Sequence, residues 1–275
     1  MDPLNLTLGF LGAGRMATAL AKGCTQTGLI AADRLLASDP WSEAREQFAA
    51  TLPAAQVTED NQQVLAESDV VVLAVKPQKM AEVLSSITSA VTPQHLLVSI
   101  AAGAPIAKLA RDLPLDTRLV RVMPNTPCLI AKGASCFSRG PTATEKDAAL
   151  VRKLLESVGS AWEVEEQQLD AVTGLSGSGP AFVYRLIEAL AQGGQEMGLP
   201  ADLSLQLAAQ TVHGAADMVL TTQLEPSVLR NQVTSPGGTT LAGLEVLEKL
   251  DGPAAFQEAV QAATIRSIEL GEQYN

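Results

Sequence analysis

Residues 6–17 read Leu-Thr-Leu-Gly-Phe-Leu-Gly-Ala-Gly-Arg-Met-Ala, and this stretch decides the fold. Its apolar first half predicts a β-strand, and Gly12, Gly14 and Ala17 then give the spacing Gly-x-Gly-x-x-Gly/Ala. The first glycine makes a tight turn, the second lets the backbone approach a pyrophosphate, and the small third residue packs a helix against the strand. A helix predicted over residues 15–27 directs its free N–H groups at phosphates. We therefore predict a dinucleotide-binding turn here rather than a chance tight turn.

The composition limits the class of protein. The chain has 275 residues, 47% hydrophobic and 18% charged, which suits one large or two modest globular domains. It has neither an apolar run of about 18 residues nor a signal-peptide pattern at its N-terminus, so we expect a cytoplasmic protein with no membrane partner. The net charge of −11 also argues against nucleic acid as a partner.

The cysteines and histidines indicate no special chemistry. Cys24, Cys128 and Cys136 are an odd number without a paired framework, which is typical of reduced thiols. His95 and His213 lie far from each other and lack close Cys/His spacing, so we expect structural roles for both and no metal site.

Strands and helices alternate over the first half of the chain. After the first helix, strands are predicted at residues 34–39, 69–75, 96–103 and 118–123, with a further strand-helix unit at 56–68. Late strands at 133–138 and 161–165 flank a helix at 143–158. This alternation predicts a doubly wound, mostly parallel sheet of the Rossmann type, in a dinucleotide-binding domain over residues 1–165.

Asp39 ends the second predicted strand, 25 positions beyond Gly14. In a dinucleotide fold an acidic side chain here accepts hydrogen bonds from the adenosine ribose and repels a 2′-phosphate, so one hypothesis is that Asp39 favours NADH over NADPH. The alternative is that Ser38-Asp39-Pro40 caps the helix predicted at 41–50. The sequence leaves both interpretations open.

Two more turns follow strands at the sheet edge where ligands bind. Lys76-Pro77 follows the strand at 69–75, and Pro77 suits the first turn of a helix. Met123-Pro-Asn-Thr-Pro127 follows the strand at 118–123, where Asn125 offers an amide donor and acceptor. Asn and Thr between prolines are also ordinary turn residues, so this motif alone favours a structural role.

The remainder, residues 166–275, is predicted to be an all-helical domain. Helices are expected at about 180–196, opened by Ser176-Gly-Ser-Gly-Pro180, and at 202–220, 226–232, 239–250 and 253–273. Between residues 173 and 216 the only charged side chains are Arg185, Glu188, Glu196 and Asp202. Helices with so little charge cannot all present a solvated face, so we predict an obligate homodimer formed through this domain.

Ser235-Pro-Gly-Gly-Thr-Thr240 precedes one of these helices. Two glycines followed by hydroxyl residues at a helix start form a nest of backbone N–H groups, which can hold an anion without a cationic side chain. The alternative is a turn capped by Ser or Thr. Beside a dinucleotide domain, the motif indicates a site for the carboxylate of a small substrate.

Several blocks together resemble the pyrroline-5-carboxylate reductase family. In order they are Gly9-Phe-Leu-Gly-Ala-Gly14, Ala74-Val-Lys-Pro77, Ser99-Ile-Ala-Ala-Gly103, Met123-Pro-Asn-Thr-Pro127, Val172-Thr-Gly-Leu-Ser-Gly-Ser-Gly-Pro-Ala181 and Ser235-Pro-Gly-Gly-Thr-Thr240. The resemblance spans nearly the whole chain. It implies reduction of the cyclic imine of 1-pyrroline-5-carboxylate to L-proline with NADH or NADPH. It also implies a Rossmann domain followed by a helical dimerisation domain, with dimers that in many members form decamers.

The resemblance also implies site residues. Residues expected to hold the cofactor are Gly12, Ala13, Gly14, Arg15, Met16, Ser38, Asp39, Asn61, Val75, Lys76, Pro77, Ala101, Ala102 and Asn125. Residues expected on the substrate side are Glu166, Ser235, Gly237, Gly238, Thr239 and Thr240, with Thr173 and Thr240 as the catalytic candidates. Threonine is a poor acid, so both are expected to position the substrate first, and the proton of the product amine can also come from an iminium substrate or water.

Two departures from the family pattern and two alternatives remain. Glu225-Pro-Ser-Val-Leu-Arg230 stands where many members have His-Pro-x-x-Leu-Lys, which bears on rate, and Ser38-Asp39-Pro40 differs from the neutral or basic endings of strongly NADPH-preferring members.

A related imine or β-hydroxyacid reductase is one alternative, but residues 173–198 lack the lysine that the hydroxyacid enzymes carry there. A cofactor-sensing protein without turnover is the other, and Thr173 with the intact 235–240 turn argues against it.

Overall fold

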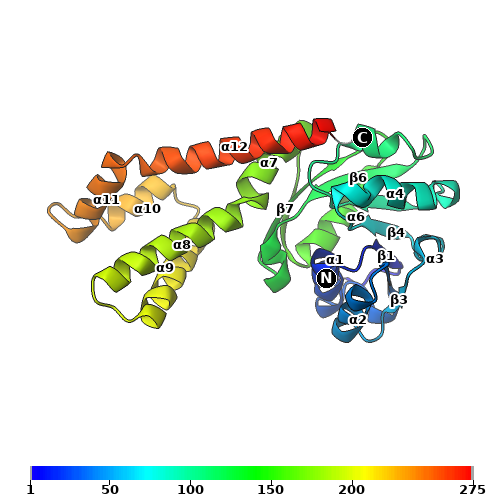
Figure 1. Ribbon diagram of the computed structural model, residues 1–275, viewed down its shortest axis with the longest axis horizontal. Helices are drawn as coiled ribbons and strands as arrows, with labels where there is room; N and C mark the ends of the chain where they lie inside the picture. The colour runs from blue at the N-terminus through cyan, green and yellow to red at the C-terminus, as the bar shows by residue number, and fades with distance from the viewer. Residues whose placement is uncertain (1, 274–275) are drawn as a thin grey trace. The chain divides into compact units, whose positions relative to one another are not determined.

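The computed structural model describes residues 2–273 and contains an eight-stranded sheet with the order β3-β2-β1-β4-β5-β6-β7-β8 (Figure 1). Its strands are β1 (Leu8–Leu11), β2 (Leu35–Ser38), β3 (Gln56–Thr58), β4 (Val70–Leu73), β5 (Leu96–Ser99), β6 (Arg118–Met123), β7 (Gly133–Arg139) and β8 (Gly159–Glu163). Neighbouring strands are parallel except β6 and β7. The predicted mostly parallel, doubly wound sheet is confirmed.

Helices cover both faces of this sheet because the central strands are apolar on both sides. On one face the core joins Leu8 and Phe10 of β1 to helices α1 (Arg15–Gln26), α2 (Ser42–Thr51) and α6 (Glu145–Glu156). On the other face, Leu11 packs with helices α3 (Asn61–Ala66), α4 (Pro77–Ile87) and α5 (Ile106–Ala110). Burying a side chain such as Phe10 fully contributes about 1.5–3 kcal/mol.

The strand register brings the glycine turn after β1 and the loops after β2, β4 and β5 to one edge of the sheet. Leu11, the last residue of β1, pairs with Ser38 of β2 and with Leu73 of β4, and Leu73 pairs with Ser99 of β5. All four strands therefore end at the same level. The segments that follow them share the carboxyl edge, where open α/β sheets bind ligands.

Short helical turns complete this part of the chain. They are η1 (Ala32–Arg34) before β2, η2 (Thr88–Ala90) after α4, and η3 (Thr126–Ile130) between β6 and β7. At the end of η3, Ala131 adopts a left-handed conformation with φ 57°, and β7 then runs antiparallel to β6.

Three short helical segments precede the first helix that the sequence predicted in this region. Helix η4 (Glu166–Gln168), α7 (Leu169–Val172) and the π-helical turn η5 (Thr173–Gly177) precede α8 (Gly179–Glu196). The prediction that Ser176–Pro180 opens a helix through Glu196 agrees with α8, which begins at Gly179 with Pro180 in its first turn, but the π-helical turn η5 before it was not predicted. Gly177 lies against the flexible end of the Met123 side chain, since a Cβ there would lie 2.4 Å from Cε of Met123.

The contacts divide the chain into two compact units. One contains the residues up to Ser178 together with the end of α12 from Ala262, and the other is Gly179–Gln261. The second unit contains α8, α9 (Ala201–Thr222), α10 (Pro226–Gln232), α11 (Thr239–Lys249) and the first half of α12 (Gly252–Gln273). These helices match the predicted ones within one or two residues. The domain boundary at 165/166 stays a prediction.

The second unit buries very little within a single chain. Within residues 179–261, all of which are described, only Ala191, Ser204 and Ala208 are fully buried. Large apolar side chains such as Met197, Leu220 and Leu250 are 70–83% exposed. A stable protein rarely leaves such apolar helices exposed to solvent. This exposure within one chain is therefore typical of a unit that oligomerises.

Candidate functional site

The glycine turn after β1 has the geometry that its sequence requires. Gly12 has a φ of +102°, and a Cβ there would lie 2.7 Å from the backbone oxygen of Ala74. Its N–H donates to the oxygen of Ser38 at 2.7 Å. The turn is therefore fixed between the ends of β2 and β4, and only glycine fits its first position.

Gly14 and the start of α1 leave room for a phosphate. Gly14 caps α1 with φ −73°, and a Cβ built on it would meet nothing within 4 Å. Within the described chain, the first turn of α1 has no acidic side chain and no side-chain cap. The open backbone and the helix dipole suit an anion, so these residues fit the pyrophosphate of a dinucleotide. Arg15 beside them is exposed.

The Asp39 carboxylate joins the glycine turn to the start of α2. Its Oδ2 accepts the N–H of Ala13 at 2.9 Å, and its Oδ1 accepts the N–H of Trp41 at 3.0 Å. Arg45 donates to the backbone oxygen of Asp39 at 2.7 Å. Asp39 thus stabilises the chain just before α2, but it does not cap that helix, because the N-cap is Trp41 and no side-chain cap hydrogen bond is present there. Its carboxylate lies beside the predicted cofactor-binding turn.

Ser38 and Asn61 form one hydrogen-bonded pair. The buried Ser38 hydroxyl donates to Oδ1 of Asn61 at 2.6 Å, and Nδ2 of Asn61 donates to Oγ of Ser86 at 3.0 Å. Asn61 is the first residue of α3. Ser38 therefore orients the side chain of Asn61 at the carboxyl edge.

The other predicted cofactor residues lie in loops along this edge. Val75 and Lys76 follow β4, and Lys76 caps α4 with Pro77 in its first turn, as predicted. Ala101 and Ala102 follow β5, where the first is buried and the second is exposed. The register of β1, β4 and β5 brings these loops together beside the glycine turn.

Asn125 makes internal hydrogen bonds with both ends of its amide. Nδ2 donates to the oxygen of Ser176 at 3.0 Å, and Oδ1 accepts the N–H of Ala134 at 2.9 Å. The side chain is 8% exposed. Asn125 therefore supports the π-helical turn η5 from the end of β6, which is the structural role that its turn sequence favoured.

Thr173 begins η5. Its hydroxyl donates to the oxygen of Leu169 at 2.8 Å, and its own carbonyl accepts the N–H of Ser178 at 2.8 Å, the wide spacing of a π-helix. Such turns occur often at functional sites. Sequence reasoning selected Thr173 and missed the π-helical turn, for which the glycines at 174 and 177 were the available signal.

Glu166 is held by protein partners. Its Oε1 accepts the N–H of Ile106 at 2.6 Å and lies 3.3 Å from Nη1 of Arg121. Arg121 is buried in β6, and sequence reasoning missed it because its partners lie 45 and 49 residues away in the chain.

The 235–240 turn lies directly before α11 in its own unit, and within it the N–H of Gly238 donates to the backbone oxygen of Ser235 at 3.0 Å. The anion nest stays a prediction. Gly237 has φ +70°, Gly238 has φ −80° and caps α11, and Thr239 and Thr240 are the first residues of that helix. Backbone N–H groups around residues of opposite φ sign form an anion-binding concavity. Ser235, Thr239 and Thr240 are exposed and available to a ligand.

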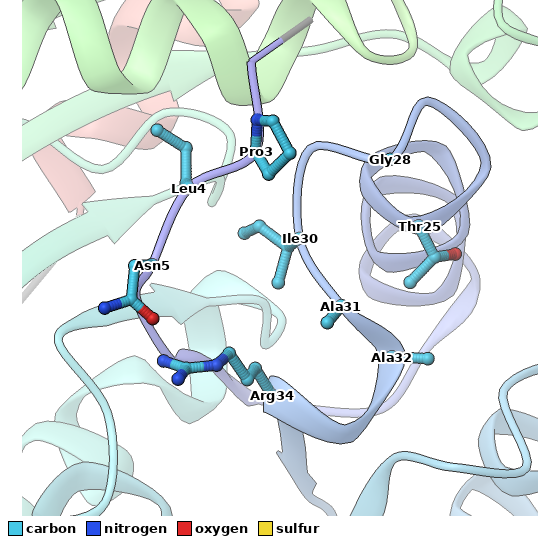
Figure 2. A pocket seen from close by; sticks show the side chains of 9 residues that line it. All are labelled: Pro3, Leu4, Asn5, Thr25, Gly28, Ile30, Ala31, Ala32 and Arg34. Carbon is cyan, nitrogen blue, oxygen red and sulfur yellow. The ribbon is translucent and has the colours of Figure 1, made fainter.

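The first unit also contains a cavity of about 550 Å³ that is separate from the glycine turn (Figure 2). Residues that immediately precede β1 and β2, such as Leu4, Asn5 and Arg34, line it together with Thr25 and Ile30. It is therefore at the amino ends of the strands, opposite the glycine turn, and it contains none of the predicted site residues.

Within residues 2–273, no cluster of three or more His, Cys, Asp or Glu side chains is arranged to hold a metal ion. None of the helices there has the length and hydrophobicity needed to cross a membrane.

Two family models match the two halves of the chain. A model described as "NADP oxidoreductase coenzyme F420-dependent" matches residues 7–103. A model described as "Pyrroline-5-carboxylate reductase dimerisation" matches residues 166–270. The match boundaries agree with an N-terminal dinucleotide fold and a C-terminal helical region.

Relatives and solved structures match over the whole chain. Pyrroline-5-carboxylate reductase of Glycine max is 47% identical over 268 residues, covering 96% of each chain, and that of Methanosarcina acetivorans is 42% identical over 269 residues, covering 98% of this chain and 99% of the relative. The crystal structure of Plasmodium falciparum pyrroline carboxylate reductase with NADP bound has a TM-score of 0.89 at 33% identity, covering 98% of this chain and all of that one. The Coxiella burnetii pyrroline-5-carboxylate reductase structure has a TM-score of 0.90 at 32% identity, covering 97% and 99%. By identity, coverage and fold, this chain belongs to the pyrroline-5-carboxylate reductase family, a family of NAD(P)H-dependent oxidoreductases.

Proposed function

We propose that this protein reduces 1-pyrroline-5-carboxylate to L-proline, the final step of proline biosynthesis. The observation that carries the proposal is the combination of an open dinucleotide turn at Gly12–Gly14 with a predicted anion nest at 235–240, in a chain 42–47% identical to pyrroline-5-carboxylate reductases. A dinucleotide-binding turn alone would be compatible with many oxidoreductases. The nest adds a place for the carboxylate of a small substrate.

The reaction adds one hydride and one proton across the imine C=N bond. When bound, NADH or NADPH supplies the hydride from C4 of its nicotinamide to the imine carbon. The electron pair of the C=N π-bond moves to the nitrogen as the hydride arrives. In a neutral imine this pair takes a proton from a hydroxyl group or water, whereas in an iminium the nitrogen already carries the proton and the pair stays on it as the lone pair of the amine. No metal is needed for this chemistry, so the protein's task is mainly orientation.

Residues at the carboxyl edge are proposed to hold the cofactor. Backbone N–H groups of residues 12–16 would bind the pyrophosphate, and Asp39 and Asn61 would contact the adenosine ribose. The loops at 75–77 and 101–102 would flank the cofactor between them. Ser38 would act through Asn61, and Asn125 would act through η5, because their side chains already form hydrogen bonds with those groups.

In the second unit, the nest is proposed to bind the substrate carboxylate. In the first unit, Thr173 and Glu166 are proposed as substrate-binding residues. Backbone N–H groups at the start of α11, with the hydroxyls of Ser235, Thr239 and Thr240, would hold the carboxylate, while the N–H of Gly238 closes the turn onto the oxygen of Ser235. Thr173 and Thr240 would position the ring and its nitrogen. Their hydroxyls are poor acids, so proton transfer is a secondary role.

We further propose a homodimer formed through the helical region, with dimers assembled into a decamer, in the cytoplasm. The exposed apolar side chains of the helical unit support self-association, because few of its residues are buried within one chain. The net charge of −11 disfavours nucleic acid and anionic membranes as partners. Sedimentation at micromolar concentration tests this part, and a folded monomer would contradict it.

The activity is tested with purified protein, 1-pyrroline-5-carboxylate and either cofactor. We expect nicotinamide absorbance to fall and proline to appear in equal amount. If the protein binds the cofactor but consumes none, the cofactor-sensing alternative replaces the proposal. If the cofactor is consumed only with other cyclic imines, the reaction class stands and the substrate is wrong.

A further inference from the structure

We propose that the buried Arg121 is a positioning residue that holds Glu166 with one carboxylate oxygen turned toward bound ligand, and that Ser267 in α12 completes this arrangement through Asp170. The inference rests on the proposed function, in which Glu166 lies in the active site. It concerns contacts within the first compact unit only.

Arg121 is the centre of the arrangement. Its side chain is only 5% exposed, and its guanidinium reaches two carboxylates, with Nη1 3.3 Å from Oε1 of Glu166 and Nη2 3.3 Å from Oδ1 of Asp170. A buried charge needs such partners, and the flat guanidinium fork fixes the direction of both. Arg121 therefore sets how η4 and α7 lie against β6.

Glu166 is held through one oxygen. Both its bond from the N–H of Ile106, at 2.6 Å, and its contact with Arg121 fall on Oε1. Among the described residues, no hydrogen bond or ion pair to Oε2 is recorded, and the side chain is 30% exposed. Oε2 is thus available to accept an N–H group. The active site of this reaction offers two such donors, the iminium nitrogen of the substrate and the carboxamide of the nicotinamide.

Ser267 supports the same arrangement from the far end of the sequence. Its buried hydroxyl donates to Oδ1 of Asp170 at 2.7 Å, the same oxygen that Arg121 contacts. Nearby, a Cβ on Gly271 would lie 3.2 Å from the oxygen of Gly103, so the end of α12 packs closely on the loop after β5. That loop contains Ala101 and Ala102, which are proposed to flank the cofactor.

A purely structural role for Arg121 predicts a different result from a positioning role. If Arg121 only stabilised the fold, its removal would lower stability and reduce kinetics independently of Glu166. If it acts through Glu166, its removal should change little once Glu166 has lost its charge. A double-mutant cycle separates the two, because contacting residues that share one function are not additive.

The experiment compares wild type, Arg121→Gln, Arg121→Lys, Glu166→Gln and the double variant Arg121→Gln/Glu166→Gln. We expect kcat/KM to fall by about 10–100-fold in Arg121→Gln, because small misplacements near a reacting centre have effects of this order. Arg121→Lys should recover part of the loss, and the double variant should be no worse than Glu166→Gln. Ser267→Ala should follow Arg121→Gln with a smaller effect, on the order of tenfold or less, since it removes one hydrogen bond to a charged group.

Arg118→Gln is the matched control. Arg118 begins the same strand and pairs with the buried Asp147 at 2.7 Å, but it lies at the amino end of β6. Its loss should lower the thermal midpoint and leave kcat/KM of the folded enzyme within about twofold, because it lies away from the carboxyl edge. Equal kinetic losses in Arg118→Gln and Arg121→Gln would overturn the proposal.

Binding measurements identify the donor that Glu166 accepts. If it is the nicotinamide carboxamide, Glu166→Gln should weaken NADH binding and leave ADP-ribose binding unchanged. If it is the substrate iminium, the variant should bind NADH and ADP-ribose as tightly as wild type does. It should then show a raised KM for the imine. Additive losses in the double variant, or a Glu166→Gln variant with wild-type binding and kinetics, would contradict the inference. A wild type that binds NADH without reducing the imine would instead contradict the proposed function. The same double-mutant cycle, measured by NADH binding instead of kcat/KM, would still decide the role of Arg121.

Discussion

The carboxylate of Asp39 accepts the N–H of Ala13 at 2.9 Å, which ties the end of β2 to the glycine turn after β1. Its other oxygen accepts the N–H of Trp41, so the negative charge is fixed in place rather than free to turn away. A fixed carboxylate at this position lies where a dinucleotide fold receives the adenosine ribose. It would accept ribose hydroxyls and repel a 2′-phosphate.

Asp39→Ser should therefore move cofactor preference toward NADPH. We expect the ratio of kcat/KM for NADH to that for NADPH to fall at least about tenfold, equivalent to about 1.4 kcal/mol, because a like charge no longer faces the 2′-phosphate. Asp39→Asn is the control for shape, since it removes the charge and keeps an acceptor oxygen. An unchanged ratio in both variants would mean that Asp39 only supports the turn and α2.

Gly12→Ala and Gly14→Ala should fail in different ways. At Gly12 a side chain would meet the oxygen of Ala74 at 2.7 Å with φ +102°, so we expect a loss of stability of about 1–3 kcal/mol. At Gly14 the Cβ would enter open space, so the fold should stay intact while the dissociation constant for NADH rises about tenfold or more. Urea unfolding and fluorescence titration measure the two effects. A Gly14→Ala variant with wild-type NADH binding would remove the pyrophosphate from this turn.

Thr240→Val should damage turnover without affecting the cofactor. The hydroxyl is exposed at the start of α11, where it is proposed to contact substrate, so we expect kcat/KM for the imine to fall about 10-fold or more, the loss of one hydrogen bond to a charged group. The dissociation constant for NADH should not change. Thr221→Val, at an exposed position of α9, is the matched control. Wild-type kinetics in Thr240→Val would exclude this residue from the site.

His95 should make stability depend on pH. Burial lowers the pKa of His95 from its ordinary value of 6.5, and Arg118 lowers this pKa further, while Asp69 opposes the shift. The folded protein also uses its neutral Nδ1 to accept the N–H of Thr92 at 3.0 Å. The unfolded state thus binds more protons below about pH 6.5, so stability should fall as the pH drops through this value toward the folded pKa.

His95→Gln tests that relation. The difference in unfolding free energy between wild type and variant, measured in urea, should favour wild type more at about pH 7.5 than at about pH 5. A difference that stays constant between these two pH values would show that His95 has the same proton affinity in both states.

The sheet and its ligand-binding edge could be predicted from local patterns. Apolar runs at β1, β4 and β5 are long enough to identify buried parallel strands, and the spacing of Gly12 and Gly14 identifies the turn between β1 and α1. Because parallel strands end at one edge, the position of the loops at 75–77 and 101–102 followed from the strands alone.

Other features depend on contacts between distant parts of the chain. The π-helical turn at 173–177 is supported by Asn125 and Met123, which belong to the end of β6 and its following turn. Arg121 contacts Glu166 and Asp170 across 45 and 49 residues, and a single sequence gives no sign of such pairing. The antiparallel strand β7 likewise follows a turn in which Ala131 is left-handed, a conformation that alanine does not predict.

Transfer of a labelled hydride tests the central claim most directly. The protein is incubated with 1-pyrroline-5-carboxylate and NADH or NADPH deuterated at C4 of the nicotinamide, and the product is examined by mass spectrometry and proton NMR. The account predicts L-proline with one deuterium on C5, the former imine carbon, from the cofactor deuterated on the transferred face. Proline without deuterium from either face, or cofactor that binds and is never oxidised, would contradict it.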